Sequence, residues 1–406
     1  MRCLFWASWW PTDESPVAGI FIKEHGQAAA LFTKVVAVHF KPAKRVMNFR
    51  NFPFSVQVDF KSEEGIDTYL VSIHMAIRRF GFYRYAVKKA IEKILQQLHK
   101  KYSFDLININ ILRTEFAELL VEENFLPGLP IVVTENSSFY YSEINLLNEQ
   151  EKKAKKNQLT RLLNSSRIKK IISVSHHLAQ TFTNTYKVNP QRIAIVPNIG
   201  ADTFFYKPSP HADNITRIVM AAQWSYPKNP FAFLHVLSKM PADKLRLLKV
   251  DWFGDGPQMA EIKELAAKVK QPVITFHGYG SKTQIADYLR EADFLLHPTD
   301  KENLPCIVIE SLCCGTPVLS NNVSGVTELL DKSNGIMVAI NNETELESAL
   351  DFMSQKKQFD RRKISEEARK KFSKEAVGEK IFCVYKEAVE AISTNKDYSH
   401  APAEAK

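Results

Sequence analysis

Two glutamates separated by seven residues, Glu302 and Glu310, stand in a segment that predicts a loop followed by a helix. Pro305 suits the first helical position, because its missing N–H costs nothing there, and Gly315 suits the helix end. Backbone N–H groups at such a helix start favour an anion such as a diphosphate. Ionised glutamates accept hydrogen bonds from sugar or ribose hydroxyls. Alone, this pair is typical of a solvated surface, and the loop–helix frame around it favours a binding site.

Short apolar runs alternate with longer helical patterns through most of the 406-residue chain. This order predicts parallel sheets with helices on both faces. The pattern restarts after Tyr206, behind a proline-rich linker at 201–210, so we expect two doubly wound domains. Ligands should then bind beyond the carboxyl ends of the strands, in a cleft where the domains face each other. The candidate strands are 1–6, 35–40, 106–111, 131–134, 171–175 and 193–197, then 217–222, 248–254, 273–277, 294–298 and 317–320.

The glutamate segment resembles the retaining GT-B glycosyltransferases of family four, whose C-terminal domain typically reads E-G-F-P-L-x-x-x-E-A-M-A-x-G-x-P-V. Residues 302–318 here read ENLPCIVIESLCCGTPV. Residues 254–257 are similar to the family's G-x-G-P turn, and 196–205 to the run that closes its first domain. These motifs follow one another in the family's order over nearly the whole chain. The resemblance implies an α/β fold of GT-B type, with two Rossmann-like domains and a last helix that crosses back to the first domain.

The same resemblance implies a division of the chain into four parts. Residues 1–203 would bind the acceptor, and 204–375 would bind a nucleotide sugar. Residues 376–393 would form the helix that packs back on the first domain. Residues 394–406, which are polar and rich in Ala and Lys, are expected to be a disordered tail.

Roles for individual residues also follow from the resemblance. Glu302 is similar to the residue that contacts the donor sugar, Glu310 to the one that binds the ribose, and Lys228 to the lysine that faces the diphosphate. A compact ammonium suits that last task, and we expect Glu302 and Lys228 to be the catalytic pair. No cluster of Asp and His converges, so neither a metal nor a cofactor is expected. The expected donor-binding set is Gly19, Gln223, Lys228, Glu302, Asn303, Leu304, Pro305 and Glu310.

Two positions depart from the family pattern. Gln223 stands where the family usually has an arginine, which removes one positive charge from the diphosphate site. Asn136 stands where it often has a histidine, and asparagine cannot titrate. We expect Asn136, Glu135 and His25 on the acceptor side, although a structural role fits His25 equally well. Trp6, Trp9 and Trp10 either shape the acceptor side or pack in the core.

The sequence therefore predicts a glycosyltransferase that moves a sugar from a nucleotide diphosphate donor to a glycan or lipid-linked acceptor, with retention, in cell-surface polysaccharide synthesis. Three alternatives stay open. A nucleotide-sugar epimerase would convert donor alone to an isomer, and a glycan phosphorylase would need phosphate and usually a pyridoxal cofactor. The departures at Gln223 and Asn136 keep an inactive donor-binding partner protein open as well.

Charge is uneven along the chain. Residues 1–200 carry 27 Lys and Arg against 17 Asp and Glu, and the remainder carries 27 against 28. The amphipathic pattern at 75–102 is either a helix with a solvated basic face or a helix at an anionic membrane surface. No nucleic-acid-binding motif is present. The five cysteines match no zinc spacing, and no 20-residue apolar run or signal-peptide pattern is visible. We therefore expect a cytoplasmic protein, with peripheral contact to the inner face of the membrane as one possibility.

Overall fold

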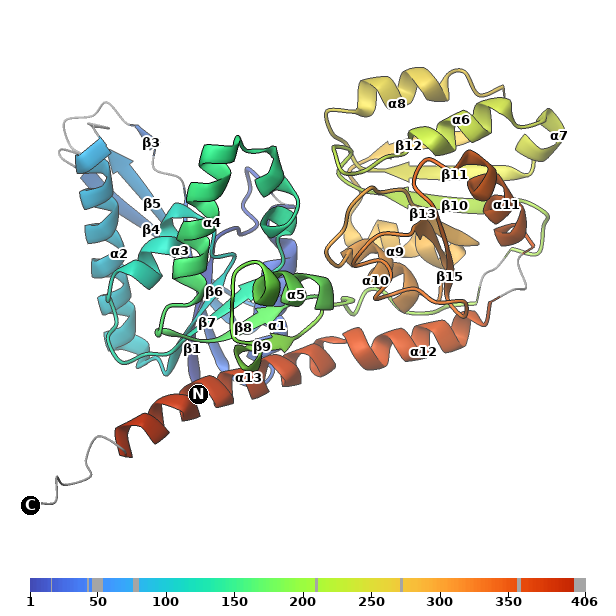
Figure 1. Ribbon diagram of the computed structural model, residues 1–406. Coiled ribbons are helices and arrows are strands. Elements are labelled where there is room, and N and C mark those ends of the chain that lie inside the picture. The colour runs from blue at the N-terminus through green and yellow to red at the C-terminus, as the bar shows by residue number, and fades with distance from the viewer. Residues whose placement is uncertain are drawn as a thin grey trace, which may run out of the picture. The chain divides into compact units, whose positions relative to one another are not determined.

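The computed structural model describes residues 1–15, 17–41, 44–45, 54–75, 80–208, 211–270, 273–355 and 359–397. The chain forms two compact units. Unit 1 contains residues Met1–Val196 together with the chain from Val377 onward, and unit 2 contains Pro197–Ala376. Figure 1 shows a sheet flanked by helices in each unit, which confirms the predicted α/β organisation with two Rossmann-like sheets.

Unit 1 is built on a sheet with the strand order β3-β5-β2-β1-β6-β7-β8-β9, and β4 runs antiparallel along β5. The chain proceeds from β1 to β2 on one side and then returns to β6 on the other, so the direction of winding changes between β1 and β6. The strands are β1 (Arg2–Ala7), β2 (Lys34–Phe40), β3 (Lys44–Arg45), β4 (Phe54–Glu63), β5 (Ile66–Met75), β6 (Leu106–Asn110), β7 (Ile131–Glu135), β8 (Ile168–Ser173) and β9 (Ile193–Ile195).

Successive side chains of β1 point to opposite faces of the sheet of unit 1, and helices cover each face. Leu4 and Trp6 belong to the core cluster that also takes in residues of α2 to α5. Cys3 and Phe5 face the other side, where Cys3 contacts Tyr385 of α13 and Phe5 lies against Gly26 of α1. The helices of this unit are α1 (Ile20–Ala30), α2 (Phe80–Tyr102), α3 (Glu115–Glu122), α4 (Glu149–Leu163), α5 (His176–Asn184) and α13 (Lys374–Asp397).

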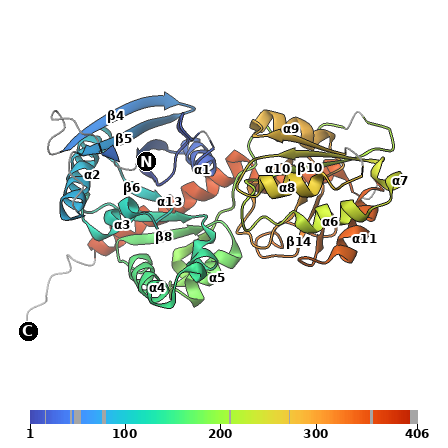
Figure 2. The same cartoon turned by 90° about the horizontal axis from the view of Figure 1, so that it is seen from above.

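The antiparallel pair β4–β5 is a feature that the sequence reasoning missed. The two strands are joined at Glu64-Gly65, and both of these residues have positive φ, at 51° and 80°. Such a two-residue connection matches the twist of a tight hairpin. In Figure 2 the pair lies at one edge of unit 1. The helix predicted from Met75 was placed too early: Met75 ends β5, residues 76–79 lie outside the described part, and α2 begins at Phe80.

The last helix, α13, is packed against unit 1. Val377, Ile381 and Tyr385 are buried there, and Glu387 forms an ion pair of 2.5 Å with Lys170. A Cβ on Gly378 would come within 2.3 Å of the Ala28 carbonyl oxygen, so α13 and α1 touch backbone to backbone. The helix continues to residue 397, beyond the expected end at 393, and the rest of the expected tail, 398–406, lies outside the described residues.

Unit 2 has a fully parallel sheet in the order β12-β11-β10-β13-β14-β15. Its winding changes direction between β10 and β13, which are neighbours at the centre. The strands are β10 (Thr216–Ala221), β11 (Leu248–Phe253), β12 (Ile274–Gly278), β13 (Phe294–His297), β14 (Val318–Asn321) and β15 (Gly335–Val338). The helices are α6 (Phe231–Lys239), α7 (Ala242–Leu245), α8 (Met259–Ala266), α9 (Lys282–Glu291), α10 (Cys306–Cys313), α11 (Glu343–Met353) and α12 (Arg361–Phe372).

Candidate functional site

Two loops of unit 2 meet where its sheet changes winding direction. One follows β10 and carries Lys228, and the other follows β13 and carries Glu302. Their backbones bond directly, since the Asn229 N–H donates to the Pro298 carbonyl at 3.1 Å and the Asp300 N–H donates to the Pro227 carbonyl at 2.9 Å. In open α/β sheets, the crevice at such a switch point is where ligands bind.

Lys228 and Glu302 are in direct contact at this crevice. The Lys228 ammonium forms an ion pair with Oε1 of Glu302, and His297 Nε2 lies 2.9 Å from the same oxygen. Burial, and then the positive charge of Lys228, lower the pKa of His297 well below its usual value. A neutral imidazole with its hydrogen on Nε2 donates to the carboxylate. His297 thereby orients Glu302, a contact that the sequence reasoning did not include.

Glu310 lies on α10 and is paired with a lysine that the sequence reasoning missed. Its Oε1 is 3.2 Å from Nζ of Lys282, the first residue of α9. The Glu310 side chain is buried, with 9% of its surface exposed, whereas Lys282 is 31% exposed. Lys282 belongs to no motif, and only the packing of α9 beside α10 brings it to this carboxylate.

The segment between the two glutamates is held by backbone contacts. The Leu304 carbonyl accepts a hydrogen bond of 2.7 Å from the Asn198 side chain. A Cβ on Gly325 would lie 2.0 Å from the Asn303 carbonyl oxygen, so the 324–325 turn packs directly on this loop. Pro305 is the N-cap of α10 in an extended conformation, so the helix begins at Cys306, one residue after the predicted start at Pro305. Asn303, Leu304 and Pro305 therefore fix the position of Glu302 relative to the α10 N-terminus.

The remaining donor-side candidates are not part of this cluster. Gln223 is exposed at the start of the loop that follows β10, five residues before Lys228. Gly19 belongs to unit 1, where it precedes α1 with φ of 68°. A Cβ there would lie 2.6 Å from the Trp9 carbonyl carbon and oxygen, so glycine is required for the α1 start to rest on the Trp9 backbone.

The three acceptor-side candidates gather at the carboxyl ends of β6 and β7 in unit 1. His25 and Asn136 line one small cavity with Asn110 and Thr134. Glu135, between them, is completely buried. The three residues that the sequence placed on the acceptor side therefore lie close together in the fold. The Glu135 carboxylate, however, points into the interior of unit 1.

Glu135 anchors the loop that follows β6. Its Oε1 accepts hydrogen bonds of 2.6 Å from the Leu112 N–H and from the Tyr140 hydroxyl. The neighbouring Arg113 guanidinium lies 5.3 Å from the Trp9 ring centre and donates from Nε to Ser137. Burial raises the pKa of Glu135 to about 7, and the hydrogen bonds oppose that shift only in part.

This raised pKa predicts a pH dependence of stability. Between the unfolded pKa of 4.5 and the folded value of about 7, the folded chain binds more protons at Glu135 than the unfolded chain does. The contribution of Glu135 to the free energy of unfolding is therefore present at acid pH. It is lost as the pH rises through this interval, by about 3 kcal/mol in total. Calorimetric Tm values at pH 5 and pH 8 should show a smaller pH-dependent change in Glu135→Gln than in the unmodified chain. Parallel pH profiles of the two proteins would contradict this assignment.

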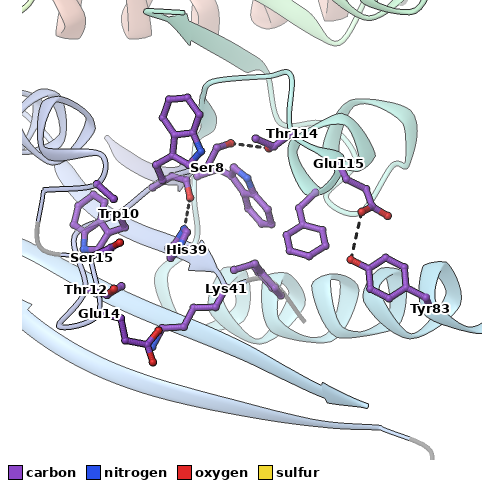
Figure 3. Close-up of a pocket in the computed structure, with 16 residues that line it drawn as sticks. Ser8, Trp10, Thr12, Glu14, Ser15, His39, Lys41, Tyr83, Thr114 and Glu115 are labelled. Atoms are coloured by element: carbon purple, nitrogen blue, oxygen red, sulfur yellow. Dashed lines mark hydrogen bonds between the residues drawn. The ribbon is translucent and has the colours of Figure 1, made fainter. Parts of the chain in front are cut away.

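A larger cavity of about 730 Å³ opens at the switch point of unit 1. It is lined by the residues that follow β1, β2 and β6, including Trp9, Trp10, Lys41 and Glu115 (Figure 3). All three tryptophans of the N-terminal segment contribute to its wall. The sequence reasoning left their role open and did not predict this cavity.

Comparison with known families decides the relationship of the chain. The model of "Glycosyl transferases group 1" matches residues 203–371, and that of "Glycosyltransferase Family 4" matches residues 54–203. The chain belongs to the family four, group 1 glycosyltransferases. Together the two matches cover residues 54–371 of this GT-B glycosyltransferase, which include parts of both units, and they meet close to the boundary between the units.

Curated relatives of this glycosyltransferase match over shorter stretches. The gpi3 subunit of phosphatidylinositol N-acetylglucosaminyltransferase from Schizosaccharomyces pombe is 27% identical over 169 residues, 41% of this chain and 36% of the relative. Alpha-monoglucosyldiacylglycerol synthase of Streptococcus pneumoniae is 30% identical over 131 residues, 31% of this chain and 29% of the relative. The chain spans less than half the length of these relatives.

Solved structures share the fold over nearly the full length of the chain. Alr3699/HepE of Anabaena, in complex with UDP and glucose, has a TM-score of 0.69 at 16% identity and covers 97% of this chain and 100% of its own. The apo form of the lipopolysaccharide outer core galactosyltransferase WaaB has a TM-score of 0.65 at 12% identity, and the match covers 95% of this chain and 99% of WaaB. These likenesses establish the GT-B architecture of this glycosyltransferase.

Several basic residues of the glycosyltransferase are neutralised within unit 1. Arg84 and Lys88 of α2 form ion pairs with Glu122 and Glu123 at the end of α3, and Lys155 of α4 pairs with Glu118. Contact of this basic region with an anionic membrane stays a prediction. Across the described ranges, no helix is long and apolar enough to span a bilayer, and no three His, Cys, Asp or Glu side chains gather as metal ligands.

Proposed function

We propose that this chain transfers a glycosyl group from a nucleotide diphosphate sugar to a hydroxyl of a glycan or lipid-linked acceptor, with retention, in the synthesis of a cell-surface polysaccharide. The observation that carries the proposal is the contact of Lys228 with Glu302 at the switch point of unit 2. A cation and an acceptor-only carboxylate fixed at one crevice suit a ligand with both phosphates and hydroxyls. Membership of the family supports the reaction class.

Each residue of the cluster has a task in this reaction. Lys228 stabilises the charge that grows on the departing nucleotide diphosphate, which is the kind of preorganised interaction that contributes most to catalysis. Glu302, held by His297, accepts hydrogen bonds from hydroxyls of the donor sugar. Glu310, held by Lys282, accepts them from the ribose. The α10 N-terminus adds a favourable field for phosphate.

Retention requires either a covalent intermediate or attack from the side of the leaving group. No side chain of the cluster is placed as a free nucleophile, because the Glu302 carboxylate is engaged by Lys228 and His297. We therefore assign a front-face displacement in which the leaving phosphate assists deprotonation of the acceptor. Detection of a glycosyl adduct on Glu302 or Glu310 by mass spectrometry of trapped protein would overturn this mechanism.

The ribose role of Glu310 gives the first experiment. Glu310→Ala should lower the affinity for UDP or another recognised nucleoside diphosphate about tenfold, because one charged hydrogen-bond acceptor for ribose is lost. Titration calorimetry against a panel of nucleoside diphosphates and nucleotide sugars measures this loss. Glu347→Ala, which removes an exposed carboxylate on α11, is the matched control and should bind as the unmodified chain does. Equal affinity in Glu310→Ala would remove the ribose assignment, and failure of every nucleotide to bind would remove the proposed function.

A further inference from the structure

Strand β4 forms one edge of the sheet of unit 1. It pairs with β5 along its whole length, Phe54–Glu63, and no other described strand pairs with its outer side (Figure 2). An edge strand presents a row of backbone N–H and C=O groups that can pair with another chain. Short length, proline and bulges usually protect such an edge, whereas β4 has 10 residues, no proline and an unbroken register with β5. Its outer side therefore suits pairing with a further strand.

The second half of β4 is exposed on both faces, since residues 57–63 are all exposed. Val58 and Phe60 point to the same face and are 39% and 52% exposed. The Phe60 ring is held against Tyr69, with ring centres 5.0 Å apart, and the Lys101 ammonium lies 5.6 Å from the Phe60 ring centre. Neighbouring apolar side chains that stay exposed on an edge strand indicate a surface for protein contact.

Opposite charges alternate with these apolar side chains. Asp59 and Lys61 are exposed and point to the other face of the strand. A partner strand that is acidic throughout would be attracted by Lys61 and repelled by Asp59, and a basic strand would meet the reverse. The favoured partner carries one charge of each sign, in the order that an antiparallel strand presents. A second copy of β4 has this pattern.

Symmetry limits the ways in which two copies of β4 can pair. Side chains directly opposite each other in an antiparallel pair share one face, so a two-fold axis must pass through a single residue position. Centred on Phe60, the pairing sets Asp59 of each copy opposite Lys61 of the other and brings the two Phe60 rings together. It pairs residues 57–63, which are the exposed part of β4.

The neighbouring registers lack this match. Centring the pair on Asp59 sets two aspartates opposite each other, and centring it on Lys61 does the same for two lysines. Like charges directly opposite in a sheet are destabilising. Centring it on Val58 sets Asp59 opposite Gln57, without an ion pair. The order of charges along β4 therefore favours the register centred on Phe60.

We propose that β4 pairs with β4 of a second copy of this chain, antiparallel and centred on Phe60, so that two 9-stranded sheets become one. The backbone groups of residues 57–63 pair across the interface, the two Phe60 rings cover each other, and two ion pairs between Asp59 and Lys61 fix the register. Each copy uses its β4 edge once, so the assembly closes at two copies. The inference is independent of the proposed function.

The test is a charge exchange, followed by analytical ultracentrifugation of the full chain from about 1 to about 100 μM. We expect the unmodified chain to shift with concentration toward twice the mass of a single copy. Lys61→Asp sets two carboxylates opposite each other at both ion-pair positions and should raise the dissociation constant at least about tenfold. The double variant Asp59→Lys/Lys61→Asp exchanges the charges and keeps them complementary. It should return the dissociation constant to within about threefold of the original value.

Controls separate loss of pairing from loss of folding. Lys332→Asp changes an exposed lysine of unit 2 by the same two charge units and should dimerise as the unmodified chain does. Calorimetric Tm values of all variants confirm that unit 1 remains folded. A single-copy mass at every concentration overturns the inference, as does an equal dissociation constant in Lys61→Asp or a double variant that pairs no better than Lys61→Asp. Assemblies that keep growing with concentration also overturn it, because they require β4 to pair with a different edge.

Discussion

Replacing Lys228 by alanine is expected to lower kcat/KM for glycosyl transfer about 10²–10³-fold, the usual loss when one preorganised charge is removed from a developing anion. The ammonium is held by Glu302 and cannot be replaced by water with the same orientation. Glucosyl or other glycosyl transfer would be measured with the donor that calorimetry identifies. Nucleotide affinity should fall much less than kcat, since the interaction strengthens as charge develops.

Lys228 and Glu302 must be tested together, because removing Lys228 also leaves the Glu302 carboxylate without its cation. In the double variant Lys228→Ala/Glu302→Gln, the losses should be far from additive if the two residues act as one unit. Lys332→Ala, an exposed lysine in the turn before β15, is the matched control and should retain full activity. Activity of Lys228→Ala within threefold of the unmodified chain would show that the diphosphate is neutralised elsewhere.

The placement of Glu302 and Glu310 was predictable because the two residues are close in sequence and framed by local signals. Pro305 and Gly315 lie at the two ends of α10. These two residues therefore predict that Glu302 precedes a helix and that Glu310 lies within it. The parallel sheets followed from the alternation of apolar runs and helical patterns in the same way. Each of these inferences needs only residues within one strand–loop–helix unit.

Several of the contacts that the prediction missed join distant segments. Lys282 reaches Glu310 through the packing of α9 beside α10, and no spacing in the sequence encodes that contact. The cavity of unit 1 needs three strand ends that are far apart in the chain, around Trp9, Lys41 and Thr114. Glu135 follows a Thr in a family-like motif, yet only the fold shows that Leu112 and Tyr140 enclose its carboxylate. Tertiary packing decides such positions, and local pattern does not.

The largest effect on stability is expected at Gly254, in the turn that supports the Lys228 loop. Its φ is 102°, and a Cβ there would lie 1.8 Å from the Ala222 carbonyl oxygen, at the start of that loop. Gly254→Ala must therefore move backbone as well as adopt an unfavourable φ, and should destabilise unit 2 by about 3 kcal/mol or more. Calorimetry should show a Tm lower by roughly 6–12 °C. Nucleotide affinity should fall too, because Lys228 is displaced with the loop.

Gly278 is the matched control, because it separates the effect of a Cβ clash with the backbone from the effect of a positive φ. It lies in the same unit and also has positive φ, 66°, but a Cβ there would meet no atom within 4 Å. Gly278→Ala should therefore cost only the left-handed conformation, about 1–2 kcal/mol, and leave nucleotide affinity unchanged. Equal losses in the two variants would mean that the turn at Gly254 yields without moving the Lys228 loop. A large loss of both stability and nucleotide affinity at Gly254 alone would show that this close backbone approach holds Lys228 in place.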